Sequence, residues 1–524
     1  MDFCSIFFLC FLFASSLLLL LRKRRRQNIS QKKRLPPQPW RLPIVGNLHQ
    51  LDPNRPHRSL LKLSQRHGPI MLLQLGSVPT LVVSSGEVVR EIFRHNDLIF
   101  SGRPPMRAAV KLFYNLCDVA FSPYGEFWRQ ARRISVHELL SAKQVRRFEA
   151  VRQQEVAKLV TAINGLCFSS SSSSSNSHLV NLSKLTLSLS NNVVCRVLLG
   201  GEYGGEGGYG GGGSGWLHEV LPKTQQLLAE LCVGDLIPWM GWVDRLTRLD
   251  ARLKNTFEEF DRFYDMVIEE HMKKGEDDEE EEEEEDMLKL LLRLRKRAEP
   301  GGFLSSMDHV KGILMDMFVA GTDTSAATIT WTMAELIKNP KVMSKLLEEL
   351  RRVIGNKSKM IEENELEKLE YLKLVVKESL RVHPAAPLLV PRETIEPCTI
   401  YGYHVPAKSR VIINATAMAL DARVWENPHD FCPERFSDGK MDFRGRHYEY
   451  IPFGAGRRIC PGINFALPIV ELALANLLHC FEWALPHGMT AEDMNMEEAL
   501  GITMHKKVPL CLAAKSKSEE TIIS

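Results

Sequence analysis

The stretch FGAGRRICPG, residues Phe453 to Gly462, places one cysteine among glycines, arginines and a proline near the end of a 524-residue chain. Pro461 is suited to the first turn of a helix, and the apolar segment INFALPIVELALANLL follows it. We therefore expect Cys460 at a helix N-terminus, where free N–H groups and the helix dipole favour a thiolate. Gly454 and Gly462 have no side chain, so the backbone around Cys460 can approach a partner closely.

Three interpretations of the Cys460 thiol can be compared. A lone cysteine is most often a small buried apolar residue. A zinc site would need further ligands at short spacing, and this segment provides none. Arg457 and Arg458, however, add positive charge beside the sulfur. One anionic sulfur, glycines that leave room for a flat partner, and arginines for its acidic groups together indicate the axial ligand of haem iron.

Charge and cysteine content argue against two classes of protein. The formal net charge is only +3, so the chain lacks the basic excess of nucleic-acid-binding proteins, and we expect no nucleic-acid partner. Eleven cysteines are scattered without a CxxC pair, which favours a reducing compartment over a disulfide framework. The length alone would suggest roughly three or four domains, but one large fold could use the whole chain.

The N-terminal segment predicts a membrane anchor. Phe3 to Leu21 contains no charged residue and approaches the ~20 residues that span a bilayer as a helix. RKRRR follows at Arg22 to Arg26, whereas Asp2 is the one charged side chain before the apolar run, so the rest of the chain is expected in the cytosol. A cleaved signal peptide is the alternative, but such peptides carry their charges before the apolar run and a cleavage site after it.

The remainder of the chain is mostly helical by pattern. Asp308 to Lys338 is apolar on all sides, as a buried central helix would be, and further helices are predicted at Lys341 to Val353 and Glu367 to Val382. Strand-like alternation covers Cys398 to Ala419 and includes a Tyr-Gly turn signal. The prediction is a mainly α fold with a minor β part. We divide the chain into an anchor at 1–21, a basic and proline-rich hinge at 22–47, and a single large domain at 48–524.

Three low-complexity segments interrupt this pattern. Ser169 to Ser175 is a serine run, Gly200 to Gly215 is mostly glycine, and Glu276 to Asp286 is entirely acidic. Segments of this kind have too little apolar area to bury, so we expect disordered surface loops at all three.

The sequence resembles a known family, the cytochrome P450 haem-thiolate monooxygenases. FGAGRRICPG matches every fixed position of the family signature Phe-x-x-Gly-x-Arg-x-Cys-x-Gly. Four further motifs occur in the family's order: Trp128-x-x-x-Arg132, AGTDTS at Ala320 to Ser325, Glu378-x-x-Arg381, and PERF at Pro433 to Phe436. The sequences of the motif segments resemble those of the plant A-type branch, in particular the 71 family.

The resemblance implies a role for each matching residue. It implies the cytochrome P450 fold and haem b, with Cys460 as the axial ligand of the iron. It assigns contacts with the haem propionates to Trp128, Arg132, Arg392 and Arg458. It assigns further haem contacts to Phe453, Gly454, Gly462 and Ala320. Asp323 and Thr324 would be the catalytic pair that delivers protons to oxygen, and Glu378 and Arg381 would form a structural network with Arg435.

The resemblance also implies partners. The chain has no Rossmann glycine fingerprint, because GGEGGYGGGG follows no strand, so electrons are expected from a separate membrane-bound NADPH–cytochrome P450 reductase. An acidic partner of this kind would be attracted by arginines on the thiolate side of the haem, namely Arg129, Arg132, Arg133 and Arg457. The expected location is the endoplasmic reticulum membrane, with a single span and a cytosolic catalytic domain.

The expected function is the use of O2 to hydroxylate or otherwise oxidise a small lipophilic plant metabolite, such as a terpenoid, an alkaloid or a phenolic. Family position assigns the pocket to Ala320, Leu388, Leu389, Ile502 and Thr503, which are apolar or small and fit all three classes. Two alternatives are a haem-thiolate isomerase or dehydratase that acts on a peroxide without a reductase, and a non-enzymatic haem-binding membrane protein. The intact Asp323-Thr324 pair argues against the first alternative. A test for NADPH consumption with added reductase would distinguish the second alternative from the expected function.

Overall fold

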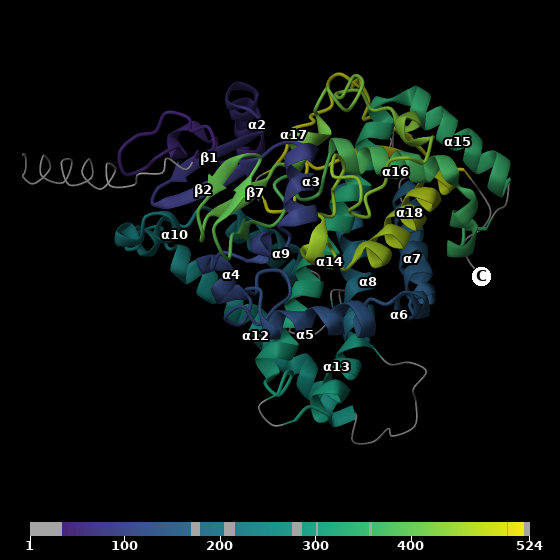
Figure 1. Ribbon diagram of the computed structural model, residues 1–524. Coiled ribbons are helices and arrows are strands. Elements are labelled where there is room, and N and C mark those ends of the chain that lie inside the picture. The colour runs from purple at the N-terminus through teal and green to yellow at the C-terminus, as the bar shows by residue number, and fades with distance from the viewer. Residues whose placement is uncertain are drawn as a thin grey trace, which may run out of the picture.

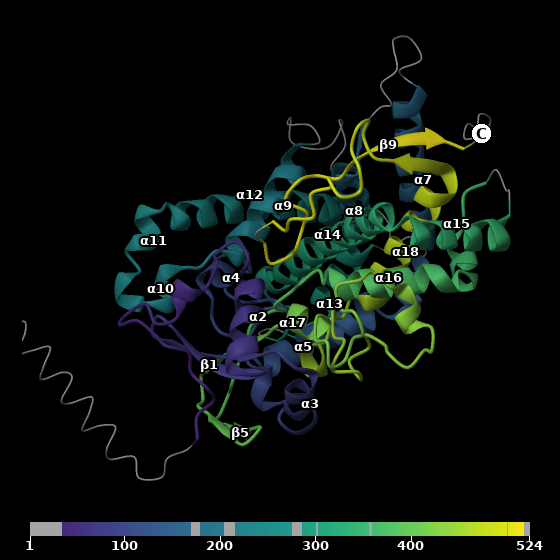
Figure 2. The ribbon, with the colours of Figure 1, turned by 90° about the horizontal axis from the view of Figure 1, so that it is seen from above.

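A long helix, α14 (Met307–Lys338), lies at the centre of the molecule, and other helices pack around it (Figures 1 and 2). The computed structural model describes residues 34–168, 179–203, 215–274, 286–299, 302–355, 359–499 and 501–517. The side chain of Ser306 accepts a hydrogen bond from Asp308 N at the start of α14, and the helix ends at Asn339, before Pro340. Most side chains of α14 are buried, which confirms the predicted central helix.

The other helices form the larger part of the body. Their bounds are α2 (Pro56–His67), α3 (Gly86–His95), α4 (Arg107–Leu112), α5 (Glu126–Ile134), α6 (Ala142–Arg147), α7 (Glu149–Phe168), α8 (Leu182–Leu199), α9 (Gly215–Ala229), α10 (Val233–Leu236), α11 (Val243–Leu246), α12 (Leu249–Lys274), α13 (Met287–Lys296), α15 (Pro340–Ile354), α16 (Glu370–Val382), α17 (Ala415–Ala419) and α18 (Ile463–Cys480). Short helical turns are η1 (Leu48–Gln50), η2 (Ile99–Ser101), η3 (Ser135–Leu139), η4 (Pro238–Met240), η6 (Glu363–Lys368), η7 (Pro433–Phe436) and η8 (Gly456–Arg458).

The β part is small and lies mainly to one side of the helices (Figure 1). The larger sheet has the order β1-β2-β7-β4, and β2 pairs with β7 in parallel while the other neighbours are antiparallel. The remaining sheets have the orders β3-β9-β8 and β5-β6. The strands are β1 (Ile70–Leu75), β2 (Val78–Val83), β3 (Leu179–Asn181), β4 (Arg392–Glu393), β5 (Cys398–Ile400), β6 (Tyr403–Val405), β7 (Arg410–Ile413), β8 (Phe481–Ala484) and β9 (Cys511–Ser516).

Two element boundaries differ from the sequence prediction. Strand structure does not extend to Ala419, because Asn414 ends β7 and caps α17: its Oδ1 accepts a hydrogen bond from Ala417 N, and its Nδ2 donates to His57 O. The predicted helix from Glu367 begins at Glu370, since a capping box at Glu362 holds the preceding residues in the separate turn η6. The Tyr-Gly turn is confirmed, because Tyr401 and Gly402 both have positive φ between β5 and β6.

The predicted low-complexity loops lie largely outside the described residues. Where the structure describes their ends, it corrects the prediction of disorder. Gly200 ends α8 in the left-handed conformation, with φ of 67°. Asp286 is buried, and its side chain caps α13 by accepting a hydrogen bond from Lys289 N. The last acid of the run therefore belongs to the folded body.

The predicted anchor, Phe3 to Leu21, also lies outside the described residues and stays a prediction. Among the described helices, α18 is long and apolar enough to cross a membrane, with a mean hydropathy of 1.5, but 61% of that window is buried inside the protein. This helix packs against α14 and α7, so its apolar character serves the core.

Candidate haem-thiolate site

The cysteine segment forms a closed loop in front of α18. Cys460 N donates a hydrogen bond to Phe453 O at 2.9 Å, which joins the two ends of the loop. Gly456 has a φ of 68°, and a Cβ placed on it would lie 2.4 Å from Oδ1 of Asp97. Glycine suits this position, because a side chain would be strained by the left-handed backbone and would collide with Asp97 and Phe93. The predicted helix start is confirmed to within two residues, since Gly462 is the N-cap of α18.

The environment of the Cys460 thiol acts in two directions. Burial raises its pKa, whereas the backbone N–H of Gly462 and the charge of Arg132 lower it, and the net direction is upward. A coordinating metal ion deprotonates a thiol outright, so the protein provides the donor and a bound cation would complete the ionisation.

Two buried arginines converge beside this loop. Arg458 donates hydrogen bonds to three backbone carbonyls, and its guanidinium lies 4.1 Å from the ring centroid of Trp128. Arg392 donates to the carbonyls of Phe100 and Ala455. Burial lowers the pKa of Arg392 to about 10, and burial together with the charge of Arg392 lowers that of Arg458 to about 9.

Other cations complete this cluster. Arg132, on α5, also lowers the pKa of Arg458 by its charge. Trp128 is buried on the same helix, and its Nε1 donates to Val119 O at 3.0 Å. Arg103 was missed by the sequence analysis, although it is buried and donates to the carbonyls of Ala120, Val390 and Pro391. The structure thus gathers the arginines that the sequence predicted, and it adds one that no motif indicated.

The middle of α14 carries the predicted catalytic pair. Ala320 is exposed in the middle of α14, where most neighbouring residues are buried, so this face of the helix borders an open space. Thr324 lies one turn further on, and its hydroxyl donates to Ala320 O at 2.8 Å. The Asp323 side chain is only 1% exposed, and its Oδ2 lies 2.9 Å from Nε2 of His505. Asp323 is therefore shielded from solvent, and His505 is a neighbour that the sequence analysis missed.

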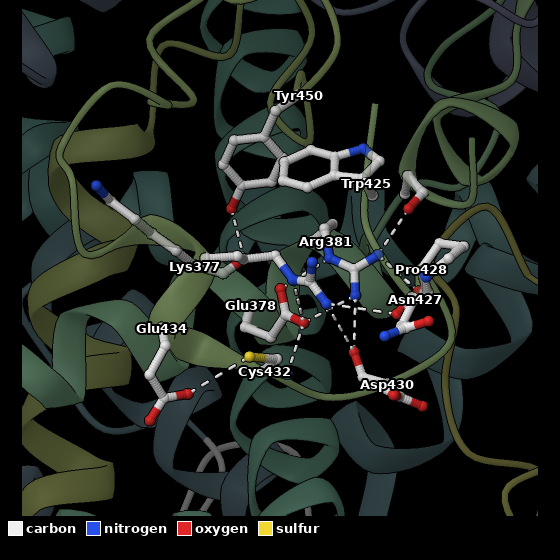
Figure 3. A network of polar contacts seen from close by, with 12 residues as sticks. Lys377, Glu378, Arg381, Trp425, Asn427, Pro428, Asp430, Cys432, Glu434 and Tyr450 are labelled. Carbon is white, nitrogen blue, oxygen red and sulfur yellow. Dashed lines mark hydrogen bonds and ion pairs between the residues drawn. The ribbon is translucent and has the colours of Figure 1, made fainter. Parts of the chain in front are cut away.

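The predicted Glu378–Arg381–Arg435 network is present (Figure 3). Glu378 accepts two hydrogen bonds from Arg381, at 2.7 and 2.8 Å, and one from Arg435 Nε at 3.0 Å. Cys432 N donates to the same carboxylate at 2.9 Å. Arg381 also donates to the carbonyls of Ala419, Pro428 and Asp430, so the network joins α16 to the segment before the cysteine loop.

A separate cavity of about 670 Å³ lies between α4, α12 and the start of α14. Its lining includes Lys311, which is ~20 Å from Thr324 along the helix at 1.5 Å per residue. Lys311 is paired there with Asp261 and Asp265. The lining includes no residue of the cysteine loop and neither Asp323 nor Thr324.

The family model for cytochrome P450 matches residues 36–512 of the chain. This chain belongs to the cytochrome P450 family. The P450 is 49% identical to strychnine-11-hydroxylase from Strychnos nux-vomica, over 98% of this chain and 97% of the relative. It is 50% identical to cytochrome P450 71A9 from Glycine max, over 93% of this chain and 94% of the relative. The resemblance to the plant 71 family is thus confirmed.

More distant matches support the same family assignment. Tabersonine/lochnericine 19-hydroxylase from Catharanthus roseus is 41% identical, over 93% of this chain and 94% of the relative. A zebra fish cytochrome P450 structure with abiraterone has a TM-score of 0.72 at 24% identity and covers 88% of this chain and 99% of that one, which shows the fold. The protein is a P450 monooxygenase, and the family implies O2, a redox partner and a small substrate.

The residues present fit a Cys-ligated haem, the cofactor of this family. Cys460 offers the thiol, and a Cβ on Gly454 would meet only Arg458 O, at 3.9 Å, so the backbone leaves clearance there. The positive charges of the clustered arginines repel one another, and the two propionates of haem would relieve that repulsion. When bound, haem supplies oxygen activation and transfer, while the protein supplies orientation and protons.

Proposed function

We propose that this P450 hydroxylates or otherwise oxidises a small lipophilic plant specialised metabolite, with electrons from NADPH through a membrane-bound reductase. The observation that carries the proposal is the Asp323-Thr324 pair on α14, in which the Thr324 hydroxyl lies one turn from exposed Ala320. A monooxygenase needs protons at the reacting oxygen, whereas rearrangement of a peroxide does not. Alkaloids are the first substrates to test, because the names of two relatives state that they hydroxylate strychnine and tabersonine or lochnericine.

The reductase is proposed to dock on the face formed by α5 and the cysteine loop. Arg133 and Arg457 are exposed there, while Arg129 pairs with Glu126 and Arg457 approaches Asp97. The arginines still outnumber the carboxylates on α5, since Glu126 is the one acidic residue of that helix. A net positive face of this kind attracts an acidic partner by long-range steering.

The membrane-facing side is proposed to include large exposed apolar residues from two segments. Trp40 and Ile44 belong to the segment before η1, and Trp239 and Trp242 belong to the region of η4 and α11. Hydrogen bonds from Gly76 N to Val45 O and from Ser77 N to Leu236 O bring the two segments together. Tryptophan suits the membrane interface, so this patch would rest on the bilayer beside the predicted anchor. The proposed location is the endoplasmic reticulum membrane, with the catalytic domain in the cytosol.

The test uses the full-length protein in vesicles with a plant NADPH–cytochrome P450 reductase and ¹⁸O2. A library of alkaloids, terpenoids and phenolics is first screened for difference spectra, and the binders are then incubated with NADPH. We expect one ¹⁸O atom in the product and strict dependence on both NADPH and reductase. Conversion of a hydroperoxide without NADPH would contradict the proposal and favour the isomerase or dehydratase alternative.

A further inference from the structure

The proposed proton path needs a route from solvent to Asp323. The Asp323 side chain is 1% exposed, so it exchanges protons poorly with bulk water by itself. The side chain of His505 is 34% exposed, and its Nε2 lies 2.9 Å from Oδ2 of Asp323. The contact is an ion pair when the imidazole is protonated, although no donor meets the hydrogen-bond geometry at Oδ2 in this arrangement. A half-buried imidazole thus stands between a buried carboxylate and water.

The backbone holds His505 in this place from both sides. Trp331, two turns after Asp323 on α14, donates from Nε1 to Met504 O at 2.8 Å. Met504 N donates to Ala385 O, and Ala499 N donates to His505 O, each at 2.8 Å. The same helix that carries Asp323 therefore fixes the segment that carries His505, and the position of the contact follows from the fold.

The charges around His505 favour proton exchange with Asp323. Burial lowers the pKa of His505 and the Asp323 carboxylate raises it, with a net upward direction. From its own segment, Lys506 faces the ring of Trp331 and the carbonyl of Asn495, and Lys507 pairs with Glu497. Gln225 on α9 and Ala385 after α16, which hydrogen-bond to the preceding residues Thr503 and Met504, are neutral. Among the described residues, Asp323 is the charged group that acts on this imidazole.

We propose that His505 is the positioning residue through which Asp323 exchanges protons with solvent. The imidazolium gives the proton on Nε2 to the Asp323 carboxylate and keeps the proton on Nδ1. The neutral ring then turns so that its bare Nε2 takes a proton from a hydronium ion in the solvent, and it turns back as an imidazolium. Asp323 then supplies this proton to the Thr324 hydroxyl. No electrons are transferred, and each turn of the relay moves one proton inward. The inference rests on the proposed function, because it extends the role of the Asp323-Thr324 pair.

The first test measures the contact without turnover. The reduced carbon monoxide complex is diamagnetic, so histidines labelled at ¹³Cε1 can be titrated by NMR in the full-length holoprotein. The His505→Gln variant identifies the His505 signal by its disappearance. We expect a His505 pKa above the ordinary value of about 6.5, and a lower one in Asp323→Asn. A pKa that is the same in the wild type and in Asp323→Asn would overturn the proposal.

The second test separates proton exchange from simple positioning. In His505→Gln we expect product per NADPH consumed to fall roughly tenfold, with hydrogen peroxide released instead. Wild-type coupling should decline as pH rises through the measured His505 pKa, and the variant should lose that dependence. His505→Lys keeps a cation beside Asp323 but stays protonated near neutral pH, so it should not restore coupling. Wild-type coupling in His505→Gln, or full recovery in His505→Lys, would overturn the proposal.

A matched control is the pair of His383, which follows α16, with Glu335 on α14. His383 Nε2 contacts Oε1 of Glu335 at 2.7 Å, so the pair has the same chemistry but does not adjoin Thr324. His383→Gln should leave product per NADPH unchanged, and the reduced carbon monoxide spectrum confirms that each variant is folded. A wild-type protein that oxidises no substrate with NADPH and reductase would overturn the proposed function, whereas the titration would still decide the Asp323–His505 contact.

Discussion

Replacement of Glu378 by glutamine should destabilise this P450 strongly, because it removes the anion from a buried cluster. Glu378 is 0% exposed and accepts hydrogen bonds from both Arg381 and Arg435. One carboxylate and two guanidinium groups give the cluster a net charge of +1, and glutamine changes it to +2. The amide fills nearly the same volume, so the loss is electrostatic rather than a cavity.

The size of the effect follows from the confinement of Arg381. Its guanidinium also donates to the carbonyls of Ala419, Pro428 and Asp430, so it cannot turn towards water when Glu378 is neutral. Removal of one partner from a buried ion pair costs about 3–5 kcal/mol. That cost corresponds to a change of roughly 10²- to 10⁴-fold in the unfolding equilibrium. A typical domain is stable by only about 5–15 kcal/mol, so the variant would lose a large part of its stability.

The assay is guanidinium-induced unfolding of the haem-loaded protein, followed by tryptophan fluorescence. Glu126→Gln is the matched control, because Glu126 and Arg129 have the same residue types and the same i,i+3 spacing on an exposed helix face. Exposed pairs of this kind contribute little, so the control should unfold at the wild-type midpoint. Equal midpoints for Glu378→Gln and Glu126→Gln would refute the reasoning that burial makes this carboxylate essential.

Three further predictions follow from other contacts. Asp316 accepts hydrogen bonds from Val119 N and Ala120 N, and burial raises its pKa to about 7. The folded protein therefore keeps this proton at pH values where the unfolded chain has lost it. The contribution of Asp316 to stability is full below about pH 4 and declines as pH rises to about 7. Asp316→Asn should flatten that part of the pH dependence of stability, measured by unfolding. Thr324→Ala should keep haem and substrate spectra but release peroxide at the expense of product by roughly tenfold or more, while Thr324→Ser should recover much of the coupling; unchanged product per NADPH in the alanine variant would contradict the relay. Deletion of residues 1–26 should release only part of the protein from vesicles, and the truncated protein should keep its normal haem content. Trp239→Ser and Trp242→Ser, added to this deletion, should complete the release. Loss of haem on deletion would show that the anchor belongs to the fold.

Local sequence patterns predicted those features whose information lies close together in the chain. The central helix α14 was predicted almost to its ends, because Pro340 marks its end and its residues are largely apolar all round. The loop around Cys460 was predicted because its glycines, arginine and proline stand within ten residues. Strand β7 was extended too far because the cap made by Asn414 depends on its contact with His57, which is distant in the sequence.

The missed site residues share one property: each depends on a distant segment. Arg103 donates hydrogen bonds to carbonyls near Val390, and no charge pattern in the sequence around it predicts a buried guanidinium. His505 meets Asp323 only because Trp331 fixes Met504 across the fold. A single histidine beside two lysines suggests an exposed basic segment, so its pairing with a buried aspartate required the structure.

The reduced carbon monoxide spectrum of the wild type and of Cys460→Ser tests most directly whether Cys460 is the iron ligand. A hydroxyl has a far higher pKa than a thiol and is a poor anionic ligand, so the variant should lose the thiolate-type band even if haem is retained. Serine fits the loop, and the hydrogen bond from residue 460 N to Phe453 O remains available, so protein yield and fold should persist. We predict a thiolate-type spectrum for the wild type and its absence in Cys460→Ser. An unchanged spectrum in the variant would contradict the account, because another residue would then hold the iron.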